Sequence, residues 1–339
     1  MTVKEELFII CKLVRMSVFG SEEDIPTGIN WPKVFRDASV NGVSALCYEA
    51  VRRLPAERQP NVDLLLRWQL SARSIREQFR NRSHVTQLLC DFLEKKNIVM
   101  LLLNGETLAC NYPDPELRES GEVDFVALPG NRASNIILDY LGIKAGSQGK
   151  PSSFVYKGIH FECHSMEPGP GFDHMRYRTV SLISGSLPKA VHRADGCLEP
   201  DHVTRAVLAV MNAARQVNSS CERIPLKMLL DLAMLLQRHP DVLKQWEPVL
   251  RQAGVYRFSR VMLCATDMLL ATDRPSEPMH RADSDHSKWN RRTMRRARKF
   301  IRIFMTDNNV NARHLARHAF LPPRIWEWLR IMFERDSED

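Results

Sequence analysis

A short block of strand-like segments between two long helical stretches constrains the fold of this chain more than any other feature. The apolar run at 98–103 has the length of one strand and contains no polar residue, which is typical of a strand buried on both faces. Residues 121–128 begin with strict alternation of polar and apolar side chains, and residues 154–164 have the pattern of a hairpin with a two-residue turn. Residues 97–165 therefore predict a small mixed α/β unit.

Apolar residues at three- and four-residue spacing predict helices on both sides of this block. One apolar stripe runs along residues 64–93. Further expected helices lie at 106–110, 134–141, 203–217, 225–237, 242–252 and 256–271. We expect an α+β fold in which a small mixed-sheet core is flanked by N-terminal and C-terminal helical regions. The expected parts are a helical region at 1–95, the α/β core at 96–186, a helical domain at 187–272, and a linker, a basic helix and a terminal helix with Trp326 and Trp328 at 273–339.

Positive charge is concentrated in one segment near the C-terminus. The chain has 48 Lys and Arg against 40 Asp and Glu, a formal net charge of +8. Residues 288–302 hold eight of the basic side chains and no acid, so the remaining chain is formally neutral. The spacing predicts an amphipathic helix that docks through its apolar side. Its cationic side suits an anionic partner, which is RNA, DNA, a membrane surface or an acidic protein, and the alternative is a merely solvated face.

Composition and cysteine spacing exclude several classes of protein. Hydrophobic residues make up 44% and charged residues 26%, which is typical of a globular protein and excludes a disordered or collagen-like chain. The eight cysteines contain no CxxC pair, which argues against a zinc knuckle and favours buried thiols in a reducing compartment. The longest apolar run falls far short of the roughly 18–20 residues that span a bilayer. We therefore expect no transmembrane segment and a cytoplasmic location.

Strand alternation brings carboxylates together. Glu122 and Asp124 share one face of their strand, and two ionised carboxylates side by side need a cation between them. Oxygen-only ligation at this spacing suits Mg²⁺. Glu162 faces the same way on the hairpin and can also take the proton from an attacking hydroxyl. The alternatives are a solvated strand face and, for His160-x-Glu162-x-His164, a zinc-type cluster or a solvent-facing strand.

The residues around these carboxylates resemble a known family. The motifs are LLNGETLA at 102–109, YPDPELR at 112–118, GEVD at 121–124 and FECH at 161–164. They resemble a bacterial family of nucleotidyltransferases in the DNA polymerase β superfamily, whose pattern is Leu-Lys-Gly, Tyr-Pro-Asp-Pro with an Arg shortly after, Gly-Asp-hydrophobic-Asp and Val-Glu-Leu-His. The helices after His202 are similar in order and spacing to the C-terminal part of that family, so the resemblance covers most of the chain.

The resemblance implies a small mixed-sheet nucleotidyltransferase core and transfer of a nucleoside monophosphate from an NTP to an acceptor hydroxyl, with Mg²⁺ or Mn²⁺. Glu122, Asp124 and Glu162 would be the catalytic residues and the metal ligands. The acceptor, a protein, an RNA or a small molecule, is not identified by the pattern. Two positions depart from the family, since Asn104 replaces its lysine and Glu122 its first aspartate. The alternative is a catalytically degenerate member that acts as a nucleic-acid or protein binding module.

The resemblance also implies residues that bind the nucleotide. Gly105 and Glu106 would form the turn where the backbone approaches a triphosphate, whereas the alternative is that Gly105 only ends a strand. Arg118 would neutralise phosphate in place of the missing lysine. Its alternative is a surface ion pair with Glu116 or Glu119.

Lys227 in the C-terminal helices completes the set of nucleotide-binding residues that the resemblance implies. It precedes Asp231 by four residues on one predicted helix. An ion pair between neighbouring turns of the helix is therefore the alternative to nucleotide binding.

Overall fold

The computed structural model describes residues 5–128, 136–137, 139–140, 152–166, 174–193, 196–219, 224–270 and 289–306. Within them, a mixed six-stranded sheet has the order β3-β4-β2-β1-β6-β5. The strands are β1 (Val99–Leu103), β2 (Glu122–Leu128), β3 (Ser152–Tyr156), β4 (Ile159–Cys163), β5 (Val191–His192) and β6 (Leu198–Glu199). The helices are α1 (Glu5–Val18), α2 (Trp31–Val40), α3 (Ser44–Val51), α4 (Val62–Glu94), α5 (Gly105–Ala109), α7 (His174–Ser186), α8 (His202–Ser219), α9 (Leu226–Arg238), α10 (Val242–Gln252), α11 (Tyr256–Leu270) and α12 (Arg291–Phe300). This mixed α/β architecture with helical flanks is the predicted fold class.

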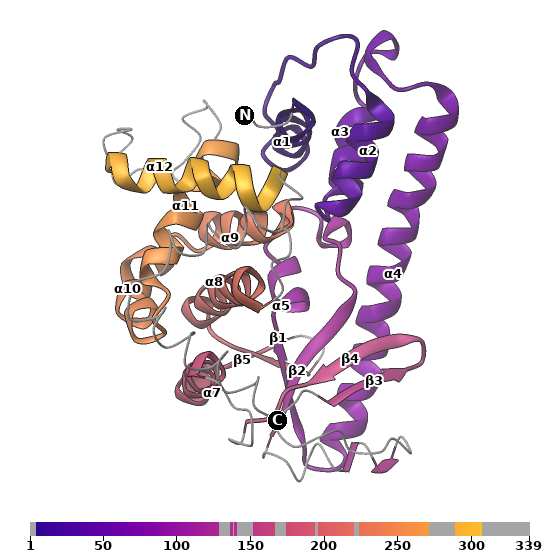
Figure 1. Cartoon of the computed structure of the whole chain (residues 1–339). Helices are drawn as coiled ribbons and strands as arrows, with labels where there is room; N and C mark the ends of the chain where they lie inside the picture. Colours follow the sequence, from indigo (N-terminus) through magenta and orange to yellow (C-terminus); the bar gives the residue numbers. More distant parts are fainter. Residues whose placement is uncertain are drawn as a thin grey trace, which may run out of the picture.

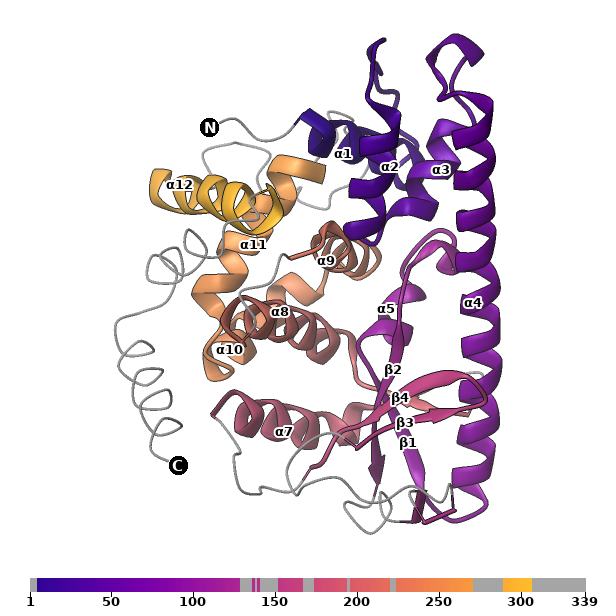
Figure 2. The same cartoon turned by 45° about the vertical axis from the view of Figure 1, so that its right-hand side comes forward.

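The sheet lies between the long helix α4 and the helices α7 and α8 (Figures 1 and 2). Alternate residues of β1 divide between the two sides, as strand geometry requires. Met100 and Leu102 pack with the C-terminal half of α4, whereas Leu101 and Leu103 pack with α7 and α8. The prediction of a strand buried on both faces is therefore confirmed.

Strand pairing places β2 at the centre of the chemistry described below. β1 runs antiparallel to β2, and β4 runs parallel to β2 on its other side. The β3–β4 hairpin turns through Lys157 and Gly158, which have φ angles of 48° and 80°. Two successive positive φ angles suit the type I′ turn that matches the twist of a hairpin, and glycine adopts such angles without a steric penalty. The predicted two-residue hairpin is confirmed.

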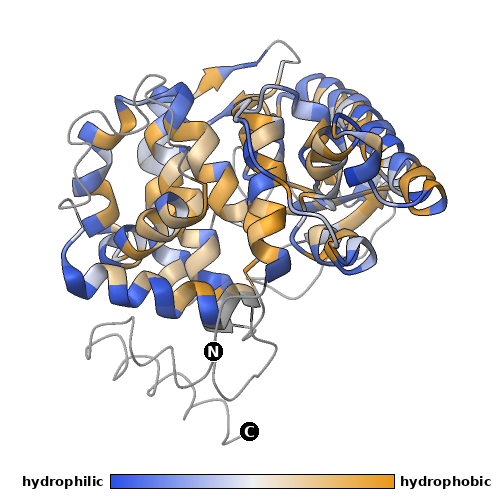
Figure 3. Ribbon diagram, turned by 90° about the horizontal axis from the view of Figure 1, so that it is seen from above, coloured by the Kyte–Doolittle hydropathy of each residue, from blue (hydrophilic) through white to orange (hydrophobic). Residues whose placement is uncertain are grey.

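The helices outside the sheet form one continuous core. Apolar residues of α1, α2 and α3 pack with those of α8, α9 and α11. The apolar faces turn inward and the polar faces outward (Figure 3). The predicted C-terminal helices agree with α8 to α11 to within two residues at each end. The sequence pattern did not predict α7, because its polar residues give it no clear apolar stripe. None of the described helices is long and apolar enough to cross a membrane.

The predicted basic helix is α12, which continues as a π-helical turn at Ile301–Thr306. Ala297, Phe300 and Ile301 are buried against the helical core, and the Phe300 ring meets that of Phe258 edge-on at 6.0 Å. Docking through an apolar side, as predicted, is therefore confirmed.

The expected boundaries between the parts of the chain stay predictions. The sheet extends to Glu199, past the boundary expected at residue 186, because β5 and β6 join its far side. The linker at 273–287 and the terminal helix with Trp326 and Trp328 lie outside the described residues, as does much of the helix expected at 134–141.

Candidate metal and nucleotide site

Carboxylates from the neighbouring inner strands β2 and β4 lie together on one face of the sheet. The register between β2 and β4 places Asp124 beside Glu162 and Glu122 beside His160. The neighbours Val123 and Phe125 point to the opposite face, where they are fully buried. The alternation that predicted a shared face for Glu122, Asp124 and Glu162 is thus present in the structure.

His164 completes this group, immediately after the end of β4. Its backbone N–H donates to the carbonyl oxygen of Phe125 at 2.8 Å, which continues the strand pairing by one residue. Its Nε2 lies 2.7 Å from Oδ1 of Asp124 and 3.9 Å from Oε2 of Glu162. Ligand atoms of Asp124, Glu162 and His164 all lie within 4.8 Å of one another. We call Glu122, Asp124, Glu162 and His164 the acidic edge.

Three carboxylates and one histidine make up the acidic edge, which contains no lysine or arginine. Burial, followed by the charges of Asp124 and Glu162, raises the pKa of the Glu122 carboxyl above its usual value. Glu122 itself stays outside the compact trio and is more exposed. A bound cation would stabilise a group of neighbouring carboxylates of this kind.

The sequence pattern did not place His164 with the predicted Mg²⁺ ligands and indicated it only in the alternative of a zinc-type cluster. The His-x-Glu-x-His spacing carried the signal, since alternation puts His160, Glu162 and His164 on one face. The two histidines differ in their surroundings. His160 pairs with Glu122 in the strand register and is exposed, whereas His164 is partly buried beside Asp124. The distinction depends on pairing between strands that are distant in sequence.

A buried network joins the loop before β2 to helix α9. The Arg118 guanidinium donates to both carboxylate oxygens of Asp231, at 2.9 Å and 2.8 Å. The Tyr112 hydroxyl donates to the same carboxylate at 2.7 Å. All three side chains are almost fully buried. We call Tyr112, Arg118 and Asp231 the buried junction.

The buried junction corrects two sequence-based alternatives. The surface ion pair expected between Arg118 and Glu116 or Glu119 is wrong, because the guanidinium is buried against Asp231. The ion pair expected between Lys227 and Asp231 within one helix is also wrong, because both carboxylate oxygens of Asp231 accept hydrogen bonds from Arg118 instead. Nε and Nη2 of Arg118 are held by Asp231, while its Nη1 donates to the carbonyl oxygen of Glu119 at 3.3 Å, and its predicted contact with nucleotide phosphate stays a prediction.

Gly105 and Glu106 begin α5, directly beneath the loop that precedes β2. The Glu106 carboxylate is buried in an ion pair with Arg82 of α4, and Arg82 also donates to the carbonyl oxygen of Ser120 at 3.0 Å. A Cβ on Gly105 would lie 2.8 Å from Oγ of Ser120, so the glycine permits close packing of this loop. These contacts give both residues a packing role, and their predicted contact with a triphosphate stays a prediction.

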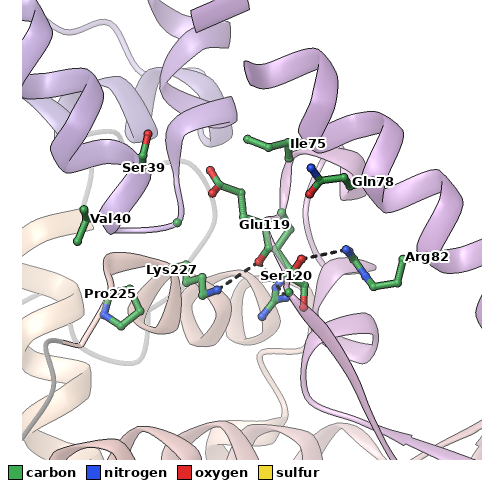
Figure 4. A pocket seen from close by; sticks show the side chains of 12 residues that line it. Ser39, Val40, Ile75, Gln78, Arg82, Glu119, Ser120, Pro225 and Lys227 are labelled. Carbon is green, nitrogen blue, oxygen red and sulfur yellow. Dashed lines mark hydrogen bonds between the residues drawn. The ribbon is translucent and has the colours of Figure 1, made fainter. Parts of the chain in front are cut away.

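A pocket of about 300 Å³ is lined by the loop at 118–121, which directly precedes the first residue of the acidic edge in the sequence. Side chains from α2, α4 and α9 surround the loop at 118–121 (Figure 4). Lys227 lies in this pocket, and its Nζ donates to the carbonyl oxygen of Glu119 at 3.4 Å. The pKa of the Lys227 ammonium is lowered, first by burial and then by the charge of the neighbouring Arg118. Nearby acids, Glu122 among them, raise it in part. Arg82 and Arg118 also line the pocket, but both are held in ion pairs with acids of the protein, whereas Lys227 takes part in no ion pair within the described part of the chain.

The fold and the family comparison agree on the class of protein. A mixed sheet with helical flanks that carries carboxylates on adjacent strands is a nucleotidyltransferase-type core. A family model described as "uncharacterised nucleotidyltransferase" matches residues 27–271, which is more than half of the chain. The protein belongs to this family. No curated protein and no solved structure matches the chain.

Proposed function

We propose that this protein transfers a nucleoside monophosphate from an NTP to an acceptor hydroxyl at the acidic edge. The observation that carries the proposal is the convergence of Asp124, Glu162 and His164 from neighbouring strands, with ligand atoms within 4.8 Å of one another. Membership in a nucleotidyltransferase family supports the same reaction class.

The donor atoms of the acidic edge fit a divalent cation. Asp124 and Glu162 offer carboxylate oxygens, and His164 offers an imidazole nitrogen. The charges of Asp124 and Glu162 also act on the Glu122 carboxyl on the same face of the sheet. Carboxylate oxygens suit both Mg²⁺ and Mn²⁺. When bound there, such an ion would stabilise charge that develops on the reacting phosphate.

A side chain of the protein would accept the proton of the acceptor hydroxyl. Glu162 is the more exposed carboxylate of the compact trio, with about 31% of its side chain accessible, whereas Asp124 is hydrogen-bonded to His164. In the proposed reaction the acceptor oxygen forms a bond to the α-phosphorus, and the bond from that phosphorus to the bridging oxygen breaks to release pyrophosphate. The hydroxyl proton passes to the Glu162 carboxylate.

Lys227 is the residue we assign to the phosphates of the NTP. Asn104 is neutral, so it cannot supply the countercharge of the family's lysine. The Lys227 ammonium lies in the pocket lined by the loop at 118–121 and contacts only one backbone oxygen among the hydrogen bonds of the described residues. In this proposal Arg118, Glu106 and Gly105 hold the loop at 118–121 in position, and Lys227 binds phosphate.

A thermal-shift panel of the four NTPs with Mg²⁺, Mn²⁺ or EDTA tests the proposal. A ligand that binds only the folded state raises the melting temperature. We expect one or more NTPs to stabilise the protein in the presence of metal and not in EDTA. Stabilisation by no NTP under any condition would leave only the alternative of a degenerate binding module.

A further inference from the structure

A second charged site lies between α11 and α12, on the opposite side of the molecule from the β3–β4 hairpin (Figures 1 and 2). A cavity of about 300 Å³ is lined by four arginines and three uncharged residues, with no acidic side chain. The arginines are Arg257 and Arg260 of α11 and Arg292 and Arg296 of α12. We call these four residues the arginine cluster.

The arginine cluster differs from the buried arginines described above because no acid forms an ion pair with it among the described residues. Within the described ranges, none of the four takes part in an ion pair, whereas Arg76, Arg82 and Arg118 all do. Arg260 donates to the Tyr256 hydroxyl at 3.3 Å and lies over the Trp289 ring, both uncharged partners.

Mutual repulsion within the cluster indicates an anionic ligand. Burial, and then the charges of Arg292 and Arg257, lower the pKa of the Arg296 guanidinium. Bringing like charges together on two packed helices costs free energy, which a bound anion would recover. Arginine suits phosphate because its planar donors bind two oxygens at once.

The extent of the charge indicates a polymer and not a single phosphate. Arg291, Arg295 and Arg298 are exposed on the same helix, so cationic side chains continue along α12 beyond the cavity. Successive turns of an α-helix are about 5.4 Å apart. That spacing is close to the separation of neighbouring phosphates along a strand of nucleic acid, so a chain of phosphates can meet several arginines in turn.

The burial of the apolar side of α12 argues against a membrane as the partner. An interfacial helix inserts its apolar face into the lipid. Here Ala297 and Phe300 are already buried in the protein core, and only the charged side is presented outward. We propose that the arginine cluster and the exposed arginines of α12 bind the phosphodiester backbone of a nucleic acid.

Fluorescence anisotropy with labelled oligo-uridylate RNA and oligo-thymidylate DNA tests this site at several salt concentrations. The test variant is Arg257→Gln/Arg292→Gln, which removes one exposed arginine from each helix. The matched control is Arg67→Gln/Arg73→Gln, which removes the same charge from the exposed surface of α4. Melting curves of both variants establish that they are folded.

We expect the wild-type protein and the control to bind with equal, steeply salt-dependent affinity. The test variant should bind about a hundredfold more weakly, because two charge-assisted hydrogen bonds are lost. The slope of log K against log salt should become shallower by about 1.4 for a single strand.

Three results would overturn the proposal. The first is an equal loss of affinity in test and control variants, which would show a response to net charge alone. The second is binding to vesicles of equal parts phosphatidylcholine and phosphatidylglycerol without binding to either oligonucleotide. The third is complete displacement of the oligonucleotide by inorganic phosphate at concentrations near that of the oligonucleotide, which would show a site for a small anion. Because Asp124→Asn should leave this binding unchanged, the proposal can succeed or fail independently of nucleotidyl transfer.

Discussion

The acidic edge and the buried junction each contain carboxylate side chains near strand β2, but only the junction neutralises its carboxylate within the protein. In the buried junction, Asp231 is almost fully buried and accepts hydrogen bonds from a guanidinium and a hydroxyl. At the acidic edge, Asp124 is partly exposed and lies among other carboxylates, with His164 as its hydrogen-bond partner. One carboxylate is neutralised within the protein, and the other is left for a ligand.

The difference separates residues that hold the fold from residues that act on a substrate. A buried ion pair with every donor and acceptor satisfied positions the elements that it joins. Clustered carboxylates repel one another, which costs stability, and they are retained where a cation or a proton is to be bound. If this division is correct, substitutions in the two regions will affect different measurements.

The largest expected effect on stability is that of Asp231→Asn. The substitution leaves the buried Arg118 guanidinium without a counter-charge, so we expect the free energy of unfolding to fall by about 3–5 kcal/mol. Urea denaturation measures this loss. The exposed variant Glu77→Gln, which breaks a surface pair with Arg73, should change the free energy by less than about 0.5 kcal/mol. A loss of similar size in both variants would show that the junction is no different from surface pairs.

Asp124→Asn should weaken ligand binding without lowering stability. The variant removes a metal ligand, and we expect metal-dependent NTP affinity to fall about a hundredfold. Its melting temperature without ligand should stay the same or rise, because a charge is removed from a repelling group. Thermal-shift titrations with Mn²⁺ and NTP give both values. Unfolding of this variant at lower temperature would mean that the acidic edge is a structural site.

Lys227→Met tests the pocket between the two regions. We expect NTP to bind about tenfold more weakly, since one charge-assisted hydrogen bond to phosphate is lost. The dependence on metal should persist, because no metal ligand is altered. The same substitution at the exposed Lys244 of α10 serves as the control. NTP affinity equal to that of the wild type would remove Lys227 from the nucleotide site.

The smallest effect is expected for Tyr112→Phe. The variant removes one of the hydrogen bonds to Asp231 and leaves its ion pair with Arg118, so the free energy of unfolding should fall by about 1 kcal/mol. NTP affinity should not change. Equilibrium denaturation together with the NTP titration checks both statements, and a selective loss of NTP affinity would place the junction within the binding site.

The elements that sequence reasoning predicted are those that depend on local patterns. The buried strand at 98–103, the hairpin turn and the helices after residue 202 all follow from spacing within a few residues. The shared face of Glu122 and Asp124 follows from the alternation of a single strand.

Partners that are distant in sequence could not be predicted in this way. Arg118 and Asp231 are 113 residues apart, and the nearer acids Glu116 and Glu119 were the natural candidates. In the structure, Glu116 pairs with arginines of α4, and Glu119 accepts from the backbone at the start of α3. The place of His164 beside Asp124 likewise depends on the register between β2 and β4.

Uptake of Mn²⁺ by the protein tests the central claim most directly. The signal of free Mn²⁺ in electron paramagnetic resonance falls as the ion is bound, so a titration reports binding without any acceptor or nucleotide. We predict uptake by the wild-type protein and by Tyr112→Phe, and a large loss of uptake in Asp124→Asn and Glu162→Gln. Equal uptake by all four proteins would contradict the assignment of the acidic edge as the metal site.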